Sequence, residues 1–278
     1  MQETNSVPIT ILKPRSGWQL IDFKELKEYK ALFYFLILRD LKIRYKQTVL
    51  GAGWAIIQPF FSMIVFSLFF GRLAKMPSDN IPYPIFAYSA LIIWTYFANS
   101  LSMSANSLVG NTELISKVYF PRILVPNAPI FAGLIDFIIS LVILIIMMFF
   151  YKIMPTPYLI IFPFLTILTV MIASGVGMWL AALNAQYRDI KYTVPFLIQI
   201  WMFVSPVVYP ASMVPEKFRL LYALNPMAGV VEGFRSILLG KTPFPFGMVI
   251  ISTIIAILLL ISGAMYFKRM ERTFADVI

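Results

Sequence analysis

Neither cysteine nor histidine occurs among the 278 residues of the chain. Their absence excludes disulfides, thiol nucleophiles, imidazole acid–base catalysis and zinc sites with the usual ligands. Charged residues are also scarce, at 13% of the chain, whereas a soluble domain carries about 25%. By contrast, 60% of the residues are hydrophobic and the mean hydropathy is +0.82. A soluble fold of this length cannot bury so much apolar surface, so the composition predicts an integral membrane protein.

Long apolar runs supply the candidate membrane spans. Crossing a bilayer takes about 20 predominantly apolar residues. We therefore expect an all-α protein with six transmembrane helices, at residues 52–71, 84–108, 129–150, 158–182, 193–211 and 247–267. Before them, residues 1–51 form a segment in which 24–46 has the spacing of an amphipathic interface helix. Residues 268–278 form a short tail.

The basic residues predict the orientation of these spans. Six spans place both termini on one side, and that side carries sixteen lysines and arginines against seven on the other. Lysine and arginine are enriched in cytoplasmic loops, so both termini are expected in the cytoplasm. The net charge of +10 is explained by these juxtamembrane residues, and no nucleic-acid partner is expected.

The segment 212–246 does not fit a simple span. It is apolar over much of its length, but Asn225-Pro226 interrupts it, and Glu232 and Arg235 add charge. Each half is too short to cross the bilayer, which favours a re-entrant or interfacial helical hairpin on the outer side. Two additional spans are the alternative. Both termini would then still lie on the same side of the membrane.

Asp136 is the one charged residue within the expected spans. It lies about seven residues into the third, which is roughly 10 Å at 1.5 Å per residue. An intramembrane acid is a functional candidate, for example in a proton-coupled carrier. The other interpretation is structural, with the carboxyl bonded to a nearby hydroxyl, amide or helix end. We favour the structural role, because a proton relay usually needs several titratable groups.

Several motifs, in order along most of the chain, resemble the membrane subunit of polysaccharide-exporting ABC transporters. They are RDLKIRYKQTVLGAGWAIIQP (39–59), LISKVYFPR (114–122), LIDF (134–137), ALNAQYRDI (182–190), SPVVYP (205–210) and LNPMAGVVEGFR (224–235). The O-antigen exporter type is the most similar, and teichoic-acid and capsule exporters are more distant. Their shared order makes the resemblance specific.

The resemblance implies an assembly in the bacterial inner membrane that does no bond chemistry in this chain. It implies a homodimer with two cytoplasmic ATPase subunits, which hold ATP and magnesium, and a glycan cargo on an undecaprenyl diphosphate lipid. This chain itself is expected to bind no cofactor and no metal. Leu239-Gly240-Lys241-Thr242 resembles the end of a nucleotide-binding P-loop, but Arg235 stands where the first glycine is required.

The resemblance also implies roles for particular residues. The residues expected to couple this chain to the ATPase are Glu113, Lys117, Tyr119, Phe120, Arg122, Tyr187, Arg188 and Asp189. The entrance for the lipid diphosphate would use Arg39, Lys42, Arg44 and Lys46. Spans one and five would line a channel with aromatic candidates Phe60, Phe66 and Trp201, and the outer gate would use Asn225, Pro226, Glu232 and Arg235.

Two other classes stay open at this point. A membrane enzyme acting on lipid-linked sugars would need paired acids or an acidic metal cluster in one pocket. The expected spans offer only Asp136. A proton-coupled carrier is the second rival, and export that requires a partner ATPase would separate the exporter from both.

Overall fold

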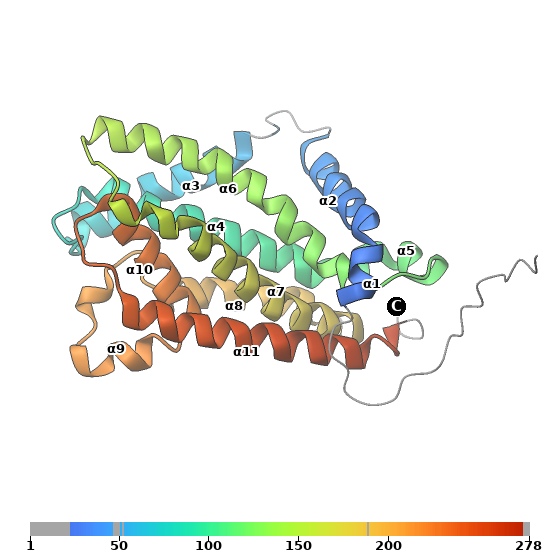
Figure 1. Cartoon of the computed structure of the whole chain (residues 1–278). Coiled ribbons are helices and arrows are strands. Elements are labelled where there is room, and N and C mark those ends of the chain that lie inside the picture. Colours follow the sequence, from blue (N-terminus) through green and yellow to red (C-terminus); the bar gives the residue numbers. More distant parts are fainter. Residues whose placement is uncertain (1–22, 47–50, 52, 188, 275–278) are drawn as a thin grey trace, which may run out of the picture.

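The computed structural model describes residues 23–46, 51, 53–187 and 189–274, and every regular element within these ranges is a helix (Figure 1). The expectations for residues 1–22, for the last four residues and for Arg188 lie outside the described residues. An all-helical architecture follows from the long apolar runs, because a helix satisfies its own backbone in lipid.

Five helical segments in the described part of the chain are long and apolar enough to cross a membrane. The first consists of α3 (Gly53–Phe66) continued by the π-helix η1 (Ser67–Leu73). The others are α4 (Tyr83–Asn106), α6 (Leu124–Phe150), the 3₁₀ turn η3 (Pro157–Ile161) with α7 (Phe162–Gln186), and α11 (Phe246–Met270). These segments correspond to five of the six expected spans.

The helix in the fifth apolar stretch is shorter than expected. α8 (Ile190–Val204) has 15 residues, which is about 22 Å and less than the roughly 30 Å of a hydrocarbon core. It ends before Ser205, whose backbone is extended. The cause is Pro206, because proline disfavours helical geometry in the residue before it. The helix expected over 193–211 therefore ends at Val204, and the last seven residues of that range are not α-helical.

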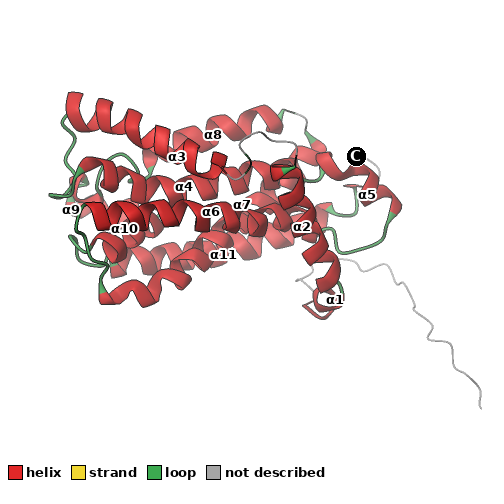
Figure 2. Cartoon of the chain, turned by 90° about the horizontal axis from the view of Figure 1, so that it is seen from above, coloured by secondary structure: helices red, strands yellow, loops and turns green. Residues whose placement is uncertain are grey.

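α4 forms the centre of the bundle. In its most apolar stretch 78% of the residues are buried, compared with 11% in the most apolar stretch of α3 with η1. α6, α7, α3, α10 and α8 all pack against α4. α3 and α8 contact it on the same side of the bundle (Figure 2). In α8 Val194 alone is buried, so these two helices leave apolar surface uncovered on a shared side.

α7 and α11 make the most extensive helix pair, and glycines allow it. A Cβ on Gly263 would lie 2.2 Å from the carbonyl oxygen of Gly175, and one on Gly175 would lie 2.6 Å from the backbone of Leu259. Both positions therefore require glycine. Small residues at helix crossings let backbones approach closely, which is how helices associate in lipid.

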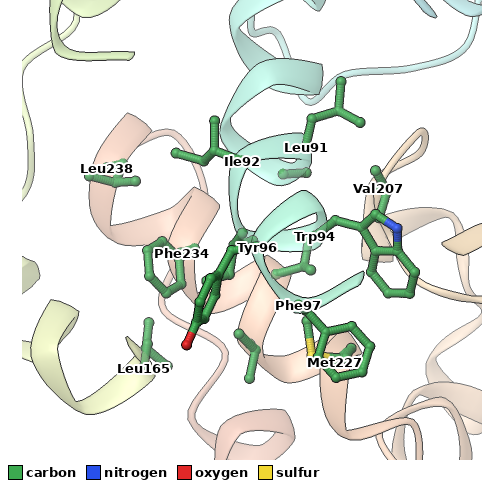
Figure 3. Close-up of a cluster of buried hydrophobic side chains, with 14 of the residues drawn as sticks. Leu91, Ile92, Trp94, Tyr96, Phe97, Leu165, Val207, Met227, Phe234 and Leu238 are labelled. Carbon is green, nitrogen blue, oxygen red and sulfur yellow. The ribbon is translucent and has the colours of Figure 1, made fainter. Parts of the chain in front are cut away.

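The segment 212–246 begins within the 3₁₀ turn η4 (Ala211–Met213) and contains the short α9 (Glu216–Tyr222) and α10 (Pro226–Leu239). Asn225 caps α10 by accepting from the Met227 amide, Pro226 is its first residue, and Gly240 ends it at φ +65°. All 14 residues of α10 are buried. Its Met227, Phe234 and Leu238 meet aromatic and aliphatic side chains of α4 (Figure 3).

The remaining short helices gather at one end of the bundle. α1 (Phe23–Glu28) and α2 (Lys30–Tyr45) replace the single helix expected over 24–46, with a break at Tyr29. The 3₁₀ turn η2 (Val109–Asn111) and α5 (Thr112–Lys117) follow α4. Figure 1 shows α1, α5 and the end of α11 together at this end.

Candidate functional site

A polar cleft of about 240 Å³ opens between the end of α2, the start of α3, and the middle of α4 and α6. Its polar lining includes Arg44 and Asp136 together with Gln58, Thr95, Asn99 and Ser102, and the ring of Trp54 forms part of its wall. Trp54 is 56% exposed. An aromatic face beside amides and hydroxyls can contact the apolar and the polar parts of one ligand.

Asp136 is bonded to two side chains at the base of this cleft. The Arg44 guanidinium donates to one carboxylate oxygen, and the Tyr45 hydroxyl donates to the other. Both partners of the ion pair are about four-fifths buried. The carboxyl is thus bonded to a neighbouring hydroxyl, as the structural interpretation expects, and also to a cation that we had assigned to the lipid entrance.

Asp136 lies deeper in its helix than expected. α6 begins at Leu124, so Asp136 is twelve residues inside it, which is about 18 Å rather than 10 Å. One turn later the Ser140 hydroxyl donates to the Ala55 carbonyl of α3 at 2.6 Å. These bonds fix the end of α2 and the start of α3 against the middle of α6.

A second polar cluster surrounds residues 205–210, the non-helical stretch after α8. Ser205, Val207 and Val208 are almost fully buried there. A buried carbonyl needs a partner, and in a non-helical stretch side chains must supply it. Arg235 donates to the Pro206 and Val207 carbonyls at 2.7 and 3.4 Å, and the Tyr83 hydroxyl donates to the Val208 carbonyl at 2.7 Å.

Arg235 is held by a buried ion pair within α10. Its Nη1 donates to the Glu232 carboxylate at 2.8 Å, and the side chains are 0% and 8% exposed, respectively. Its guanidinium also lies over the Phe86 ring, 3.8 Å from the centroid. A planar group that stacks on a ring while it donates to a carboxylate and to separate carbonyls is chemistry that lysine cannot reproduce.

Asn225 joins α8 to α10. It accepts from Trp201 Nε1 at 2.7 Å and donates to the Ser205 hydroxyl at 2.9 Å, in addition to capping α10. Three of the four residues assigned to an outer gate, Asn225, Glu232 and Arg235, thus bond to residues 201–211. Pro226 contributes by starting α10.

The three aromatic channel candidates differ in how much of each ring is free. Phe60 is 37% exposed on α3. Phe66 is partly covered and makes an edge contact with Phe70. Trp201 is hydrogen-bonded and packs its ring edge-on against Phe97, so it holds α8 against α4.

The coupling candidates separate into exposed and anchored residues. Glu113 and Lys117 form an exposed pair on α5, and Tyr119 is 72% exposed. Phe120 is buried against the cluster that contains Leu36 and Phe267.

Arg122 bonds through its side chain and its amide to Glu271, just beyond α11, at 2.8 and 3.1 Å. Phe120 and Arg122 therefore fix the loop that carries the exposed residues. Tyr187 and Asp189 are exposed between α7 and α8.

The basic residues assigned to the lipid entrance are spread along α2. Arg39 pairs with Asp40 at 2.8 Å, while Lys42 and Lys46 are exposed. Arg44 alone among these four lines the polar cleft.

Sequence reasoning missed Tyr45, Trp54 and Gln58 as cleft residues. The sequence did signal that a lone acid in an apolar span needs a partner, but Arg122 and Lys152 are nearer along the chain than Arg44, so it did not indicate which one.

The five long apolar helical segments define a helical integral membrane protein. The profile of the ABC-2 type transporters matches residues 31–239, and the chain belongs to this family of transporter membrane subunits.

Individual relatives span most of the chain. The O-antigen export system permease protein RfbA of Myxococcus xanthus is 28% identical over 259 residues, which are 92% of this chain and 98% of that protein. A protein of the same name from Klebsiella pneumoniae is 27% identical over 241 residues, 86% of this chain and 92% of that protein. The polysialic acid transport protein KpsM of Escherichia coli is 24% identical over 203 residues, 71% of this chain and 77% of that protein.

Proposed function

We propose that this chain is the membrane subunit of an ATP-driven exporter that carries an undecaprenyl-diphosphate-linked polysaccharide of the O-antigen class across the bacterial inner membrane. The observation that carries the proposal is the similarity to O-antigen export permeases over 92% of the chain, within the ABC-2 type transporter family. A capsule polysaccharide is the second candidate cargo. KpsM supports it with lower identity and coverage.

The working unit in this proposal is a homodimer with the channel between two copies. The apolar faces of α3 and α8 support it, because both helices pack on α4 and leave large side chains such as Phe61 and Phe196 more than 60% exposed. In the most apolar stretch of α3 with η1 11% of the residues are buried, against 33–78% in the other four long apolar segments. Phe60 and Phe66 would then guide the sugars through weak, repeated stacking, while Trp201 would support the channel wall by holding α8 against α4.

The proposed topology has six crossings with both termini in the cytoplasm. The fifth consists of α8 and the non-helical residues 205–210, whose buried carbonyls are satisfied by Arg235 and Tyr83. Non-helical backbone at membrane depth requires that kind of cover. α9 and α10 follow as a hairpin on the outer side, where Asn225, Glu232 and Arg235 hold the channel exit.

ATP hydrolysis belongs to two separate cytoplasmic subunits in this proposal, and these hold the nucleotide and magnesium. Glu113, Lys117 and Tyr119 form the docking surface, with Tyr187 and Asp189 beside the start of α8. Phe120 and Arg122 anchor the same loop to the bundle. A movement of α5 caused by the ATPase would therefore be transmitted through these contacts to the end of α11.

The diphosphate headgroup is proposed to arrive at the basic face of α2. Lys42 and Lys46 are exposed and available to an anion, while Arg39 is paired with Asp40. Guanidinium and ammonium groups favour phosphate oxygens through charge-assisted hydrogen bonds. Arg44 stays with Asp136 and supports the structure behind this surface.

Deletion of the gene tests the proposed function in the native cell. We expect loss of surface glycan, together with accumulation of full-length lipid-linked glycan on the cytoplasmic side of the inner membrane. Complementation with the parent chain should reverse both effects. Loss of glycan synthesis itself, without accumulation, would instead indicate an enzyme.

A further inference from the structure

An apolar groove of about 740 Å³ runs beside the C-terminal half of α6. Its walls come from α6, the turn that follows it, η3, the start of α7, and α10. Eleven of its twelve lining residues are apolar, and the twelfth is Lys152. Met148 and Leu238 are 5% and 4% exposed, respectively, so they form its floor.

Lys152 is fixed at the end of this groove by the way α6 ends. Its backbone is in the left-handed region at φ +54°, and the next amide, that of Ile153, bonds back to the Met148 carbonyl at 2.9 Å. This is the pattern of a helix end that normally uses glycine. The Lys152 side chain is exposed, and it has no carboxylate partner in the part of the chain that the structure describes.

The length of the groove matches one leaflet of a bilayer. From Leu141 to Phe150, the last residue of α6, is nine helical steps, or about 14 Å, and Lys152 follows two residues later. Half of a hydrocarbon core is about 15 Å. An apolar channel of that length with a cation at its surface end has the shape and charge of a phospholipid binding site. The headgroup phosphate would meet Lys152, and one acyl chain would follow α6 toward the bilayer centre.

We infer that the groove holds an anionic diacyl phospholipid of the leaflet at the C-terminal end of α6. The lining includes no residue of α3 or α8, the helices proposed to face the second copy, which argues against a protein occupant. The inference needs the chain to be a membrane protein, but it does not depend on the identity of the exported cargo.

Native mass spectrometry of the full chain from nanodiscs of phosphatidylcholine doped with phosphatidylglycerol tests the inference. The matched control is Lys75, which is also exposed, also left-handed at φ +50° and also just beyond a span. One basic residue near an anionic lipid surface contributes about 1 kcal/mol. Lys152→Glu removes that charge and adds an opposite one, so it should lower phosphatidylglycerol retention by at least about five-fold. Lys75→Glu should retain lipid at the parent level.

Two further variants test the groove itself. Leu159→Trp should reduce retention of both lipids, because the larger ring occupies the acyl-chain space. Met154→Cys, whose new thiol is the only one in that variant, should not cross-link to a second copy. Equal retention in Lys152→Glu and Lys75→Glu would overturn the inference. So would unselective binding of phosphatidylcholine, recovery of an isoprenoid diphosphate in place of phospholipid, or a disulfide between two copies of the Met154→Cys variant.

Discussion

Removal of the Arg235 guanidinium should destabilise the protein far more than removal of the Arg219 guanidinium. Arg235 and Glu232 form an i,i+3 pair in α10, and Arg219 and Glu216 form a pair of the same spacing in α9. The first pair is 0% and 8% exposed and the second 40% and 89% exposed. The two pairs therefore share residue types and spacing but differ in burial.

The magnitude follows from burial, because Arg219 also donates to two backbone carbonyls, those of Val214 and Ser212. Arg235→Gln leaves the Glu232 carboxylate without its cation and weakens the contacts to the Pro206 and Val207 carbonyls. Breaking a buried pair by removing one partner costs about 3–5 kcal/mol, while an exposed pair is worth about 0–1 kcal/mol. At about 2–4 °C per kcal/mol for a chain of this size, Tm should fall by roughly 6–20 °C for Arg235→Gln and by a few degrees at most for Arg219→Gln.

Thermal unfolding of the detergent-purified chain, followed by intrinsic tryptophan fluorescence, measures this difference. Glu232→Gln combined with Arg235→Met removes both charges and should recover part of the lost stability, because the uncompensated carboxylate is gone. Equal Tm shifts for Arg235→Gln and Arg219→Gln would refute the assignment of Arg235 as the residue that holds residues 205–210.

Three other results are expected. Asp136→Asn should keep appreciable export, because the amide still accepts from Tyr45, whereas strict dependence of parent export on a proton gradient would contradict its structural role. Glu113→Lys or Lys117→Glu should weaken copurification of the ATPase partner without lowering Tm, since both side chains are exposed; unchanged copurification would remove α5 from the docking surface. Cysteine at Ser78 should react with an impermeant maleimide in intact cells and cysteine at Lys191 should not, and the reverse pattern would invert the proposed topology.

The span positions could be predicted because apolar run length is a strong local signal. Five stretches became long helices close to the expected bounds. The errors at the ends of the expected helices come from single prolines, whose effect is lost when hydropathy is averaged over many residues. Pro206 ends α8 early, and α6 starts before Pro129 because the first turns of a helix need no amide donors at Pro126.

The polar pairings were the part that could not be predicted. Arg44 and Asp136 are 92 residues apart, and Arg235 reaches carbonyls 28 and 29 residues earlier in the chain. Composition indicates that such charges need partners, but it does not say which ones. For the same reason the sequence left open whether the hairpin that contains Glu232 and Arg235 is re-entrant or interfacial, and the structure buries all of α10.

Export by purified components in proteoliposomes tests the central claim most directly. The chain and its partner ATPase would be reconstituted with lipid-linked glycan, and glycan transferred across the bilayer would be measured with and without ATP. The account predicts transfer only when both subunits and ATP are present, and no ATP turnover by this chain alone. ATP hydrolysis by the isolated chain, or transfer driven by a proton gradient without the ATPase, would contradict it.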